Sequence, residues 1–403
     1  MIIQEEFSCV RDGLTIRGTV LRPEGSGKVP TVIASHGFMS NRNTVKKEAQ
    51  MFAARGFAVV AFDFNGGGPG SKSDGKSTEM SVLTEKADLL AVFAAVRTLD
   101  FVDPADITLC GFSQGGFVSA LVAAELQEQV RRLILFFPAL CIPDDARAGR
   151  MMFARFDPKN IPETFRCGFM KLGRRYAADV VDLDPYPLIE GYRGPVLILH
   201  GTADKVVDIS YSRRAYEAYL AQRGGKPAAD CQLVTIDKAN HGFRGLFSRG
   251  WLPFAFFAIE KFIEGKAPIL NVDVHLTTTE VEKLPDAKRL RLHFTGSADG
   301  MYFTGAVREG AFDEQMHVGG KPDTCHADYF VDGTDYLGQS CSVNICNDMP
   351  SGEPKDWAKG WVPTVRTESA ALSFLNEQQC ETYARMRRCG PYIHIFAKPA
   401  PRA

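Results

Sequence analysis

Short apolar runs alternate with helix-like segments through the first two-thirds of the sequence, and this alternation limits the possible folds more than any other feature. The runs are nearly continuous in apolar residues and lie at 30–35, 57–62, 107–110, 133–137, 196–200 and 232–236. Segments with a helical pattern, such as residues 43–55 and 82–99, separate them. Strands that are apolar at every position are buried on both faces, so the pattern predicts an α/β fold: a mostly parallel sheet with helices on both faces.

The alternation of apolar runs and helical segments changes at two places, which divide the chain. Residues 142–192 are rich in Pro, Arg, Asp and aromatic residues and show no clear strand, which is typical of an inserted cap over a binding site. After about residue 266 the long helices stop, and short strand-like segments lie between Gly- and Asp-rich turns. We therefore expect two domains: residues 1–265, with the cap inside them, and a mainly β domain over residues 270–403, for which a small barrel is one possible form.

The composition argues against several classes of partner. Lys plus Arg (47) nearly equals Asp plus Glu (48), a net charge of −1 that predicts no binding to nucleic acid or to an anionic membrane. No basic segment followed by a long apolar run opens the sequence, and the longest apolar stretches are too short to span a bilayer, so a cytoplasmic location is expected. In that reducing compartment the ten scattered cysteines are expected to be free thiols, many of them buried.

The sequence Gly111-Phe112-Ser113-Gln114-Gly115 follows one of the apolar runs and precedes a helical segment. This G-x-S-x-G pattern is typical of a nucleophile elbow, in which a serine on a sharp strand-to-helix turn raises its hydroxyl above the sheet edge. Glycines flank it because side chains at those positions would clash, and the N-terminus of the following helix favours an anion at the same place. Ser113 is therefore the predicted nucleophile; a glycine-rich turn with an incidental serine is the alternative.

A carboxylate is expected after the serine in the chain, followed by a histidine. Asp204 falls in the loop just after the apolar run at 196–200, from which it can reach a histidine. Asp208, four residues on, is the alternative, but it is more simply explained as a helix N-cap. Asp204 is therefore the predicted acid of the triad.

His241 follows the apolar run at 232–236 and has both the right order and a loop setting. The earlier histidines, His36 and His200, each end a strand before a glycine. We predict that His241 takes the proton of Ser113 and returns it to the leaving alcohol, while Asp204 fixes the imidazole tautomer. Ser113 would form an acyl-enzyme, which water then hydrolyses.

Two backbone N–H groups must face the oxyanion of such a tetrahedral intermediate. The first is expected from Gln114, the residue after the nucleophile. The second is expected from the loop after the first core strand, His36-Gly37-Phe38, where the N–H of Phe38 is the predicted donor. A simple strand-ending turn is the alternative for this His-Gly sequence.

These motifs give residues 1–265 a resemblance to the α/β-hydrolase esterases, and within them to the bacterial cinnamoyl or feruloyl esterase-like group. It is carried by His36-Gly37-Phe38, Asp63 with the loop at 66–73, the elbow at 111–116, Phe-Asp-Pro-Lys-Asn-Ile-Pro at 156–162, and residues 200–204 and 240–241. The resemblance implies an α/β-hydrolase fold whose cap contacts an aromatic acid through Phe153, Phe156, Phe165 and Phe169; the alternative is that these form the cap's own core. Two features differ from the group: the Asn-Gly-Gly-Gly-Pro-Gly loop at 65–70, where a single GHG-like turn is usual, and the second domain.

The second domain faintly resembles a bacterial domain of unknown function that forms a small β-barrel, a resemblance that implies no activity. Its candidate metal ligands repeat no C-x-x-C or H-x-x-x-H spacing, so no metal site is expected; they are His317, Cys325, His326, Asp328, Cys341 and Cys346. Trp357 and Trp361 lie in a loop with Gly and Pro and either anchor the core or stack on a ligand. Dimerisation, extension of the substrate pocket and ligand binding are all open roles for this domain.

The sequence therefore predicts a cytoplasmic serine carboxylesterase that hydrolyses small or aromatic, hydroxycinnamoyl-type esters and needs no cofactor. An acyltransferase or a peptidase could use the same triad, because fold does not choose among these reactions. A non-catalytic scaffold that binds a ligand is a third hypothesis, disfavoured because no triad member is missing. The expected partner is a small-molecule ester, and a homodimer is possible.

Overall fold

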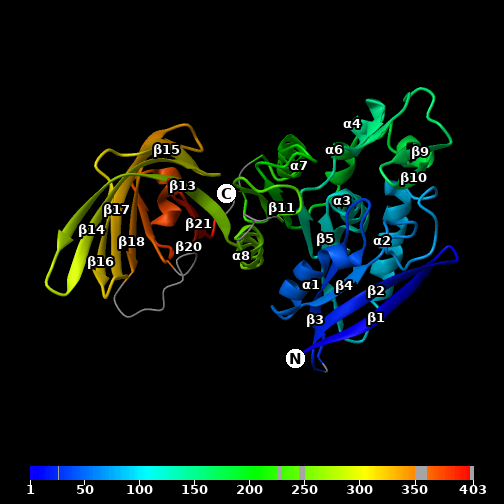
Figure 1. Ribbon diagram of the computed structural model, residues 1–403, viewed down its shortest axis with the longest axis horizontal. Helices are drawn as coiled ribbons and strands as arrows, with labels where there is room; N and C mark the ends of the chain where they lie inside the picture. Colours follow the sequence, from blue (N-terminus) through cyan, green and yellow to red (C-terminus); the bar gives the residue numbers. More distant parts are fainter. Residues whose placement is uncertain (26, 226–227, 245–249, 350–360, 400–403) are drawn as a thin grey trace. The chain divides into compact units, whose positions relative to one another are not determined.

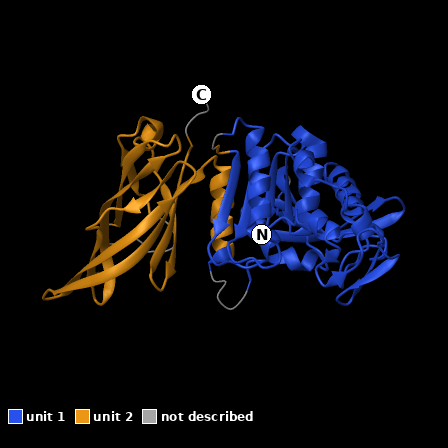
Figure 2. Cartoon of the chain, turned by 90° about the horizontal axis from the view of Figure 1, so that it is seen from above, with its two compact units in different colours: residues 1–226, 230–251 blue, residues 227–229, 252–403 orange. Residues whose placement is uncertain are grey.

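The structure of the protein is a computed structural model that describes residues 1–25, 27–225, 228–244, 250–349 and 361–399. The chain divides into two compact units (Figure 2): unit 1 comprises residues 1–226 and 230–251, and unit 2 comprises residues 227–229 and 252–403. Each unit has its own sheet and its own hydrophobic core.

Unit 1 contains an eight-stranded sheet in the order β1-β2-β4-β3-β5-β6-β11-β12 (Figure 1). Its strands are β1 (Ile2–Arg11), β2 (Leu14–Pro23), β3 (Val29–Ser35), β4 (Ala58–Phe62), β5 (Val102–Phe112), β6 (Arg132–Phe136), β11 (Val196–Gly201) and β12 (Cys231–Ile236). β2 is antiparallel to both neighbours, and all other pairs are parallel. Every residue of β4 and β11 is buried, as in parallel strands covered on both faces. The predicted α/β fold is confirmed.

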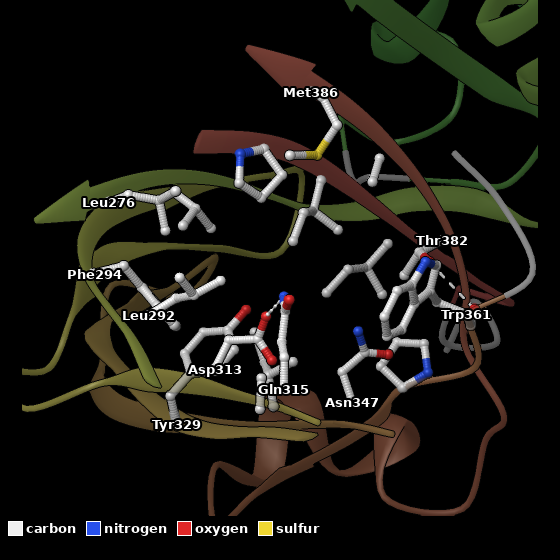
Figure 3. Close-up of a pocket in the computed structure, with 18 residues that line it drawn as sticks. Leu276, Leu292, Phe294, Asp313, Gln315, Tyr329, Asn347, Trp361, Thr382 and Met386 are labelled. Atoms are coloured by element: carbon white, nitrogen blue, oxygen red, sulfur yellow. Dashed lines mark hydrogen bonds between the residues drawn. The ribbon is translucent and has the colours of Figure 1, made fainter. Parts of the chain in front are cut away.

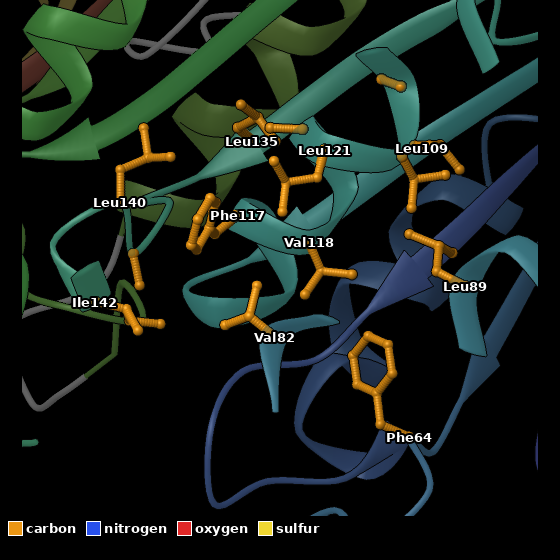
Figure 4. Packing of buried hydrophobic residues seen from close by; sticks show 14 of the residues in the cluster. Phe64, Val82, Leu89, Leu109, Phe117, Val118, Leu121, Leu135, Leu140 and Ile142 are labelled. Carbon is orange, nitrogen blue, oxygen red and sulfur yellow. The ribbon is translucent and has the colours of Figure 1, made fainter. Parts of the chain in front are cut away.

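Helices cover this sheet and join it in a large hydrophobic core (Figure 4). They include η1 (Arg42–Val45), α1 (Lys46–Ala53), α2 (Val82–Val96), α3 (Gln114–Leu126), η2 (Gln127–Gln129), α6 (Pro185–Ile189) and α7 (Ile209–Ala221). α3 packs against α2, α6 and the strands β3, β5 and β6. Its first ten residues are all buried, which explains why it is apolar on all sides rather than amphipathic. The N-terminus of α3 is therefore held rigidly at the carboxyl end of β5.

Residues 142–192, the predicted cap, lie between β6 and β11 and contain two small hairpins as well as short helices. These elements are α4 (Ile142–Arg147), β7 (Arg150–Met151), β8 (Ala154–Arg155), β9 (Thr164–Cys167), β10 (Met170–Gly173), α5 (Arg175–Ala178) and α6. The expectation of no strand in this segment is wrong. Strands of two to four residues are too short for an alternating pattern to stand out in the sequence.

Unit 2 is mainly β, as predicted, and its described residues form nine strands in one antiparallel sheet. The strands are β13 (Ala267–Lys283), β14 (Ala287–Asp299), β15 (Phe303–Val307), β16 (Phe312–Val318), β17 (Lys321–Asp335), β18 (Ser340–Met349), β19 (Thr364–Thr367), β20 (Glu381–Arg387) and β21 (Gly390–Ala397), with η3 (Ala370–Leu375) before β20. β19 and β20 lie at opposite ends of the sheet order, yet the N–H of Thr382 in β20 donates to the carbonyl of Trp361, three residues before β19. The sheet is therefore curled so that its two ends approach each other (Figure 1).

Helix α8 (Trp251–Ile263) falls almost wholly within unit 2. The ring of Phe254 stacks on His394 of β21 with centroids 4.0 Å apart, and Phe257 lies 5.3 Å from Phe396. The buried Lys261 donates to Glu381 of β20 at 2.6 Å. The division between the units thus lies one helix earlier than the boundary expected at 265–270, because α8 packs on β20 and β21.

Two further observations concern the chain as a whole. All ten cysteines are free, as predicted, and six of them are buried. None of the helices in the described ranges is long and apolar enough to cross a membrane.

Candidate active site

The turn between β5 and α3 has the geometry of a nucleophile elbow. Ser113 has φ 54° and ψ −118°, a strained conformation for a residue with a side chain. A Cβ added to Gly115 would lie 2.3 Å from the carbonyl oxygens of Ser35 and His36, and one added to Gly111 would lie 2.3 Å from the carbonyl of Gly115. Backbone packs directly on backbone around the serine, which is why the motif requires glycine on both sides.

Asp204 and His241 are brought together at the carboxyl ends of β11 and β12. Nδ1 of His241 lies 2.7 Å from Oδ2 of Asp204, whose side chain is completely buried. Oδ1 of Asp204 accepts from the backbone N–H groups of Val206 and Val207 at 2.8 and 3.0 Å. Burial opposes ionisation, but the hydrogen bonds from His200 and His241 outweigh it and hold the pKa of Asp204 well below its usual value. An ionised acceptor at Nδ1 leaves Nε2 of His241 free to accept a proton.

His200 is a second histidine in contact with Asp204. Its Nε2 lies 3.0 Å from the carbonyl of Val207 and 3.3 Å from Oδ2 of Asp204. Because a carbonyl only accepts, Nε2 carries the proton, and Nδ1 accepts from the hydroxyl of Ser212 at 2.7 Å. The sequence suggested only that His200 ends a strand; in the structure it also fixes the carboxylate that orients His241.

Phe137 connects the elbow with His241. The N–H of Ser113 donates to the carbonyl of Phe136, and the carbonyl of Ser113 accepts from the N–H of Ala139. Phe137 lies between Phe136 and Ala139 in the chain and has φ 39°. The centroid of its ring is 4.4 Å from that of the His241 ring. The segment that carries Phe137 is thus bonded to the serine backbone on both sides and packs on the histidine ring.

The predicted oxyanion donors lie on two adjoining turns. Gln114 is the first residue of α3, so its N–H has no carbonyl of the same helix to bond. The loop of Phe38 follows β3 directly beside the elbow, since a Cβ on Gly37 would lie 3.1 Å from Cβ of Ser113. The loop at 65–70 supports it: the N–H of Gly68 donates to the carbonyl of Ser40, and a side chain at 68 would collide with that backbone.

A buried polar network joins both of these turns to the cap. The hydroxyl of Tyr176 in α5 donates to Oε1 of Gln114 at 2.5 Å, while Nε2 of Gln114 donates to Glu85 of α2 at 2.7 Å. The ring of Tyr176 also packs on Phe38, with centroids 5.1 Å apart. Burial raises the pKa of Glu85 to about 8. Neither Tyr176 nor Glu85 is marked by any local motif, so the sequence did not identify them.

The four phenylalanines predicted to contact an aromatic acid have two different environments. Phe156 and Phe165 lie 5.0 Å apart and pack in the core of unit 1. Phe153 and Phe169 are 71% and 68% exposed. The contact of these rings with a substrate stays a prediction.

The remaining candidate residues have structural settings of their own. Asp208 accepts from the N–H of Ser210 and caps α7, the role considered for it as an alternative. Among the described residues, His326, Cys346 and Asp348 of unit 2 offer ligand atoms within 4.8 Å of one another, and His326 already bonds Asp348 at 2.6 Å. Trp357 lies outside the described residues.

Comparisons with known proteins agree with the fold of unit 1. Residues 28–165 match the family described as serine aminopeptidase, S33. A solved structure of Est1E from Butyrivibrio proteoclasticus with bound ferulic acid is 28% identical, with a TM-score of 0.55 over 63% of this chain and 99% of that chain. The α/β-hydrolase GrgF from Penicillium sp. sh18 is 16% identical, with a TM-score of 0.51 over 65% of this chain and 98% of that chain, and shows the fold alone.

Curated relatives match shorter parts of the chain. An uncharacterized 31.7 kDa protein in the traX-finO intergenic region of Escherichia coli is 31% identical over 130 residues, which are 32% of this chain and 44% of that protein. The uncharacterized peptidase YtmA of Bacillus subtilis is 22% identical over 208 residues, which are 50% of this chain and 73% of that protein. The chain thus spans less than half the length of the first of these relatives.

Proposed function

Unit 1 has the α/β-hydrolase fold, and from that premise we propose that the protein is a serine carboxylesterase that hydrolyses small or aromatic, hydroxycinnamoyl-type esters. The single observation that carries the proposal is the 2.7 Å hydrogen bond between His241 Nδ1 and the buried Asp204. These two residues follow Ser113 in the order acid, then histidine, that is typical of a triad with its serine at a nucleophile elbow. A serine whose general base is oriented in this way is equipped for acyl transfer.

The proposed reaction has two half-reactions. Nε2 of His241 takes the proton of the Ser113 hydroxyl as Oγ of Ser113 attacks the ester carbonyl. His241 then gives this proton to the leaving alcohol. His241 next removes a proton from water, whose oxygen attacks the carbonyl of the acyl-enzyme. His241 then returns that proton to the oxygen of Ser113 as its bond to the acyl group breaks and the carboxylic acid leaves. Asp204 stabilises the imidazolium in both halves, and the N–H groups of Phe38 and Gln114 stabilise the two oxyanions.

Support for an aromatic acyl group comes from the likeness to Est1E and from the cap. Est1E was solved with ferulic acid bound, and it is the relative with 28% identity over nearly its whole length. In this chain the cap residue Tyr176 packs on Phe38 and bonds Gln114, so the cap adjoins both proposed oxyanion donors. A substrate whose acyl group contacts the cap would therefore meet aromatic side chains.

A peptidase is the second candidate, favoured by the description of the family that residues 28–165 match and by the name of YtmA. The same nucleophile, base and oxyanion donors cleave amides, where His241 must protonate an amine rather than an alcohol. Aminoacyl p-nitroanilides therefore belong in the test beside esters.

The test is a substrate panel: p-nitrophenyl acetate to octanoate, methyl ferulate, chlorogenic acid and aminoacyl p-nitroanilides. We expect turnover of the esters, with kcat/KM for methyl ferulate exceeding that for the anilides. Ser113→Ala should lower kcat by about 10⁵–10⁶-fold, because it removes the nucleophile. A fluorophosphonate probe should label the wild type and leave the variant unlabelled.

Thermal unfolding of Ser113→Ala at the wild-type temperature is the control for folding. Turnover of anilides in preference to esters would replace the esterase with the peptidase. Ester hydrolysis that survives Ser113→Ala would overturn the proposed mechanism, and a chain that turns over nothing and resists the probe would point to a non-catalytic role.

A further inference from the structure

The curled sheet of unit 2 surrounds a partly open cavity of about 140 Å³ (Figure 3). Its walls come from β13, β14, β16, β17, β18, β20 and β21 and from the segment before β19. Along each strand every second residue faces inward, as Asp313 and Gln315 do on β16, and Ala327 and Tyr329 on β17. Most of the lining is aliphatic or aromatic, so the cavity offers a site for an apolar molecule.

A row of polar side chains crosses one wall of this cavity. Asp313 of β16 is directly opposite Ala327 of β17, which is directly opposite Asn347 of β18. Residues paired in this way lie on the same face of a sheet. Ala327 has only a methyl group at the centre of this row, and Asp313 and Asn347, at its two ends, both line the cavity (Figure 3).

Two oxygens in this row are buried and accept no hydrogen bond from any residue in the described part of the chain. They are Oδ1 of Asp313 and Oδ1 of Asn347. Oδ2 of Asp313 already accepts from Nε2 of Gln315 at 2.7 Å, and Oε1 of Gln315 is paired with Nε2 of His317 at 2.9 Å. Leaving buried acceptors without hydrogen bonds costs free energy, so a molecule in the cavity that donates a hydrogen bond to one of these oxygens would be stabilised there.

The size and composition of the cavity restrict the ligand further. A cavity of about 150 Å³ lined by Leu, Ile and Phe is large enough for benzene. Three aromatic residues, Phe294, Tyr329 and Trp361, contribute to the walls, and rings pack well against rings. No described lining residue is a lysine or an arginine, while Asp313 contributes a carboxyl group. The lining therefore disfavours an anion.

We propose that unit 2 binds a neutral molecule with one aromatic ring and a hydroxyl group, that is, a phenol, whose hydroxyl donates to Oδ1 of Asp313. The ring occupies the apolar part of the cavity and lies over the methyl group of Ala327. The site lies wholly within unit 2 and is independent of the proposed esterase activity.

The test uses the full chain and three probes of one shape: p-cresol, toluene and 4-methylbenzoate, titrated by saturation-transfer NMR. We expect p-cresol to bind about tenfold or more tightly than toluene, because only p-cresol has a hydroxyl that can donate to the buried oxygen of Asp313. 4-Methylbenzoate should not bind, because its carboxylate would face Asp313 and Asn347 without a countercharge. Equal binding of all three probes, or no binding of p-cresol, would overturn the proposal.

Variants then assign the site. Asp313→Leu should abolish the preference for p-cresol over toluene, and Ala327→Phe should abolish binding of both by filling the centre of the cavity. Asp328→Leu makes the same change as Asp313→Leu at an exposed position one residue from Ala327, and should bind like the wild type. Thermal unfolding checks each variant; should Ala327→Phe fail to fold, Asp313→Leu alone decides. Binding of p-cresol with its preference unchanged in Asp313→Leu would place it elsewhere and refute the site.

Discussion

Asp204 and Asp208 are four residues apart and have distinct roles, which makes them a matched pair for substitution. Asp204→Asn should lower kcat for p-nitrophenyl acetate by about 10⁴-fold, because an amide no longer selects the tautomer with the proton on Nδ1 of His241. Asp208→Asn should have wild-type kcat, since asparagine is an equally good N-cap for α7. Steady-state kinetics on both variants would decide; loss of activity in Asp208→Asn alone would reassign the acid.

The buried carboxyl group of Glu85 makes the stability of the folded protein depend on pH. Burial raises its pKa from 4.5 to about 8 in the folded protein. Between these values the folded state keeps a proton that the unfolded state has lost, so the free energy of unfolding falls as the pH rises through this window. Glu85→Gln is neutral throughout, and its Tm should exceed that of the wild type by a margin that grows from about pH 5 to about pH 9.

Calorimetric scans across that range measure the difference. The exposed Glu128→Gln is the control and should follow the wild type at every pH. Parallel curves for the wild type and Glu85→Gln would mean that Glu85 titrates normally in the folded protein.

At the scale of elements, the crossing of α3 over β3 positions the proposed site. Gly115 lies where the helix backbone meets the carbonyls of Ser35 and His36, and a Cβ there would be 2.3 Å from both oxygens. Gly115→Ala must therefore push α3 away from β3, which we expect to cost about 1–3 kcal/mol of stability. The shift would also separate Gln114 from Phe38 and lower kcat.

Denaturant unfolding and ester hydrolysis test this expectation together. Gly27→Ala is the matched control, because a Cβ at Gly27 meets nothing within 4 Å. Wild-type stability in Gly115→Ala would show that the crossing can adjust without loss.

The cap shows why some strands could not be predicted from the sequence. Its hairpins β7–β8 and β9–β10 have strands of two to four residues, too short for an alternating pattern. The N-terminal hairpin β1–β2 was likewise not predicted, although its turn, Asp12-Gly13, is a common hairpin signal. Its strands are only partly buried at the sheet edge, so they lack the continuous apolar runs that marked the inner strands.

At the scale of the whole molecule, α8 decides where the chain can be divided. Its phenylalanines pack on β20 and β21, and Lys261 is buried against Glu381. A fragment of residues 252–403 should unfold cooperatively. A fragment of residues 266–403 should have a Tm lower by roughly 10 °C or more, because it exposes the surface that two buried aromatic rings cover.

Circular dichroism melts of the two fragments, at equal concentration, provide the measurement. The longer fragment serves as the reference for the shorter one. Equal melting temperatures would mean that α8 adds nothing to the stability of unit 2 and that a boundary at 265–270 is the better division.

The inner strands, the elbow and the order of Ser113, Asp204 and His241 could be predicted from the sequence alone. Each depends on residues close together in the chain: an apolar run forms a buried strand, and glycines at fixed offsets permit one particular turn. The relation of Asp208 to α7 is local in the same way, since an N-cap bonds an N–H two residues on.

Only the tertiary structure decided which distant side chains complete these local features. Tyr176 and Gln114 are 62 residues apart, and Glu85 lies a further 29 residues from Gln114 on the other side, yet the three form one buried network. In unit 2 the row of Asp313, Ala327 and Asn347 exists only because three strands pair in one register, and a slip of one residue would turn these side chains to the opposite face. Contacts between residues far apart in the chain depend on how whole strands and helices pack, which the local pattern around each residue does not specify.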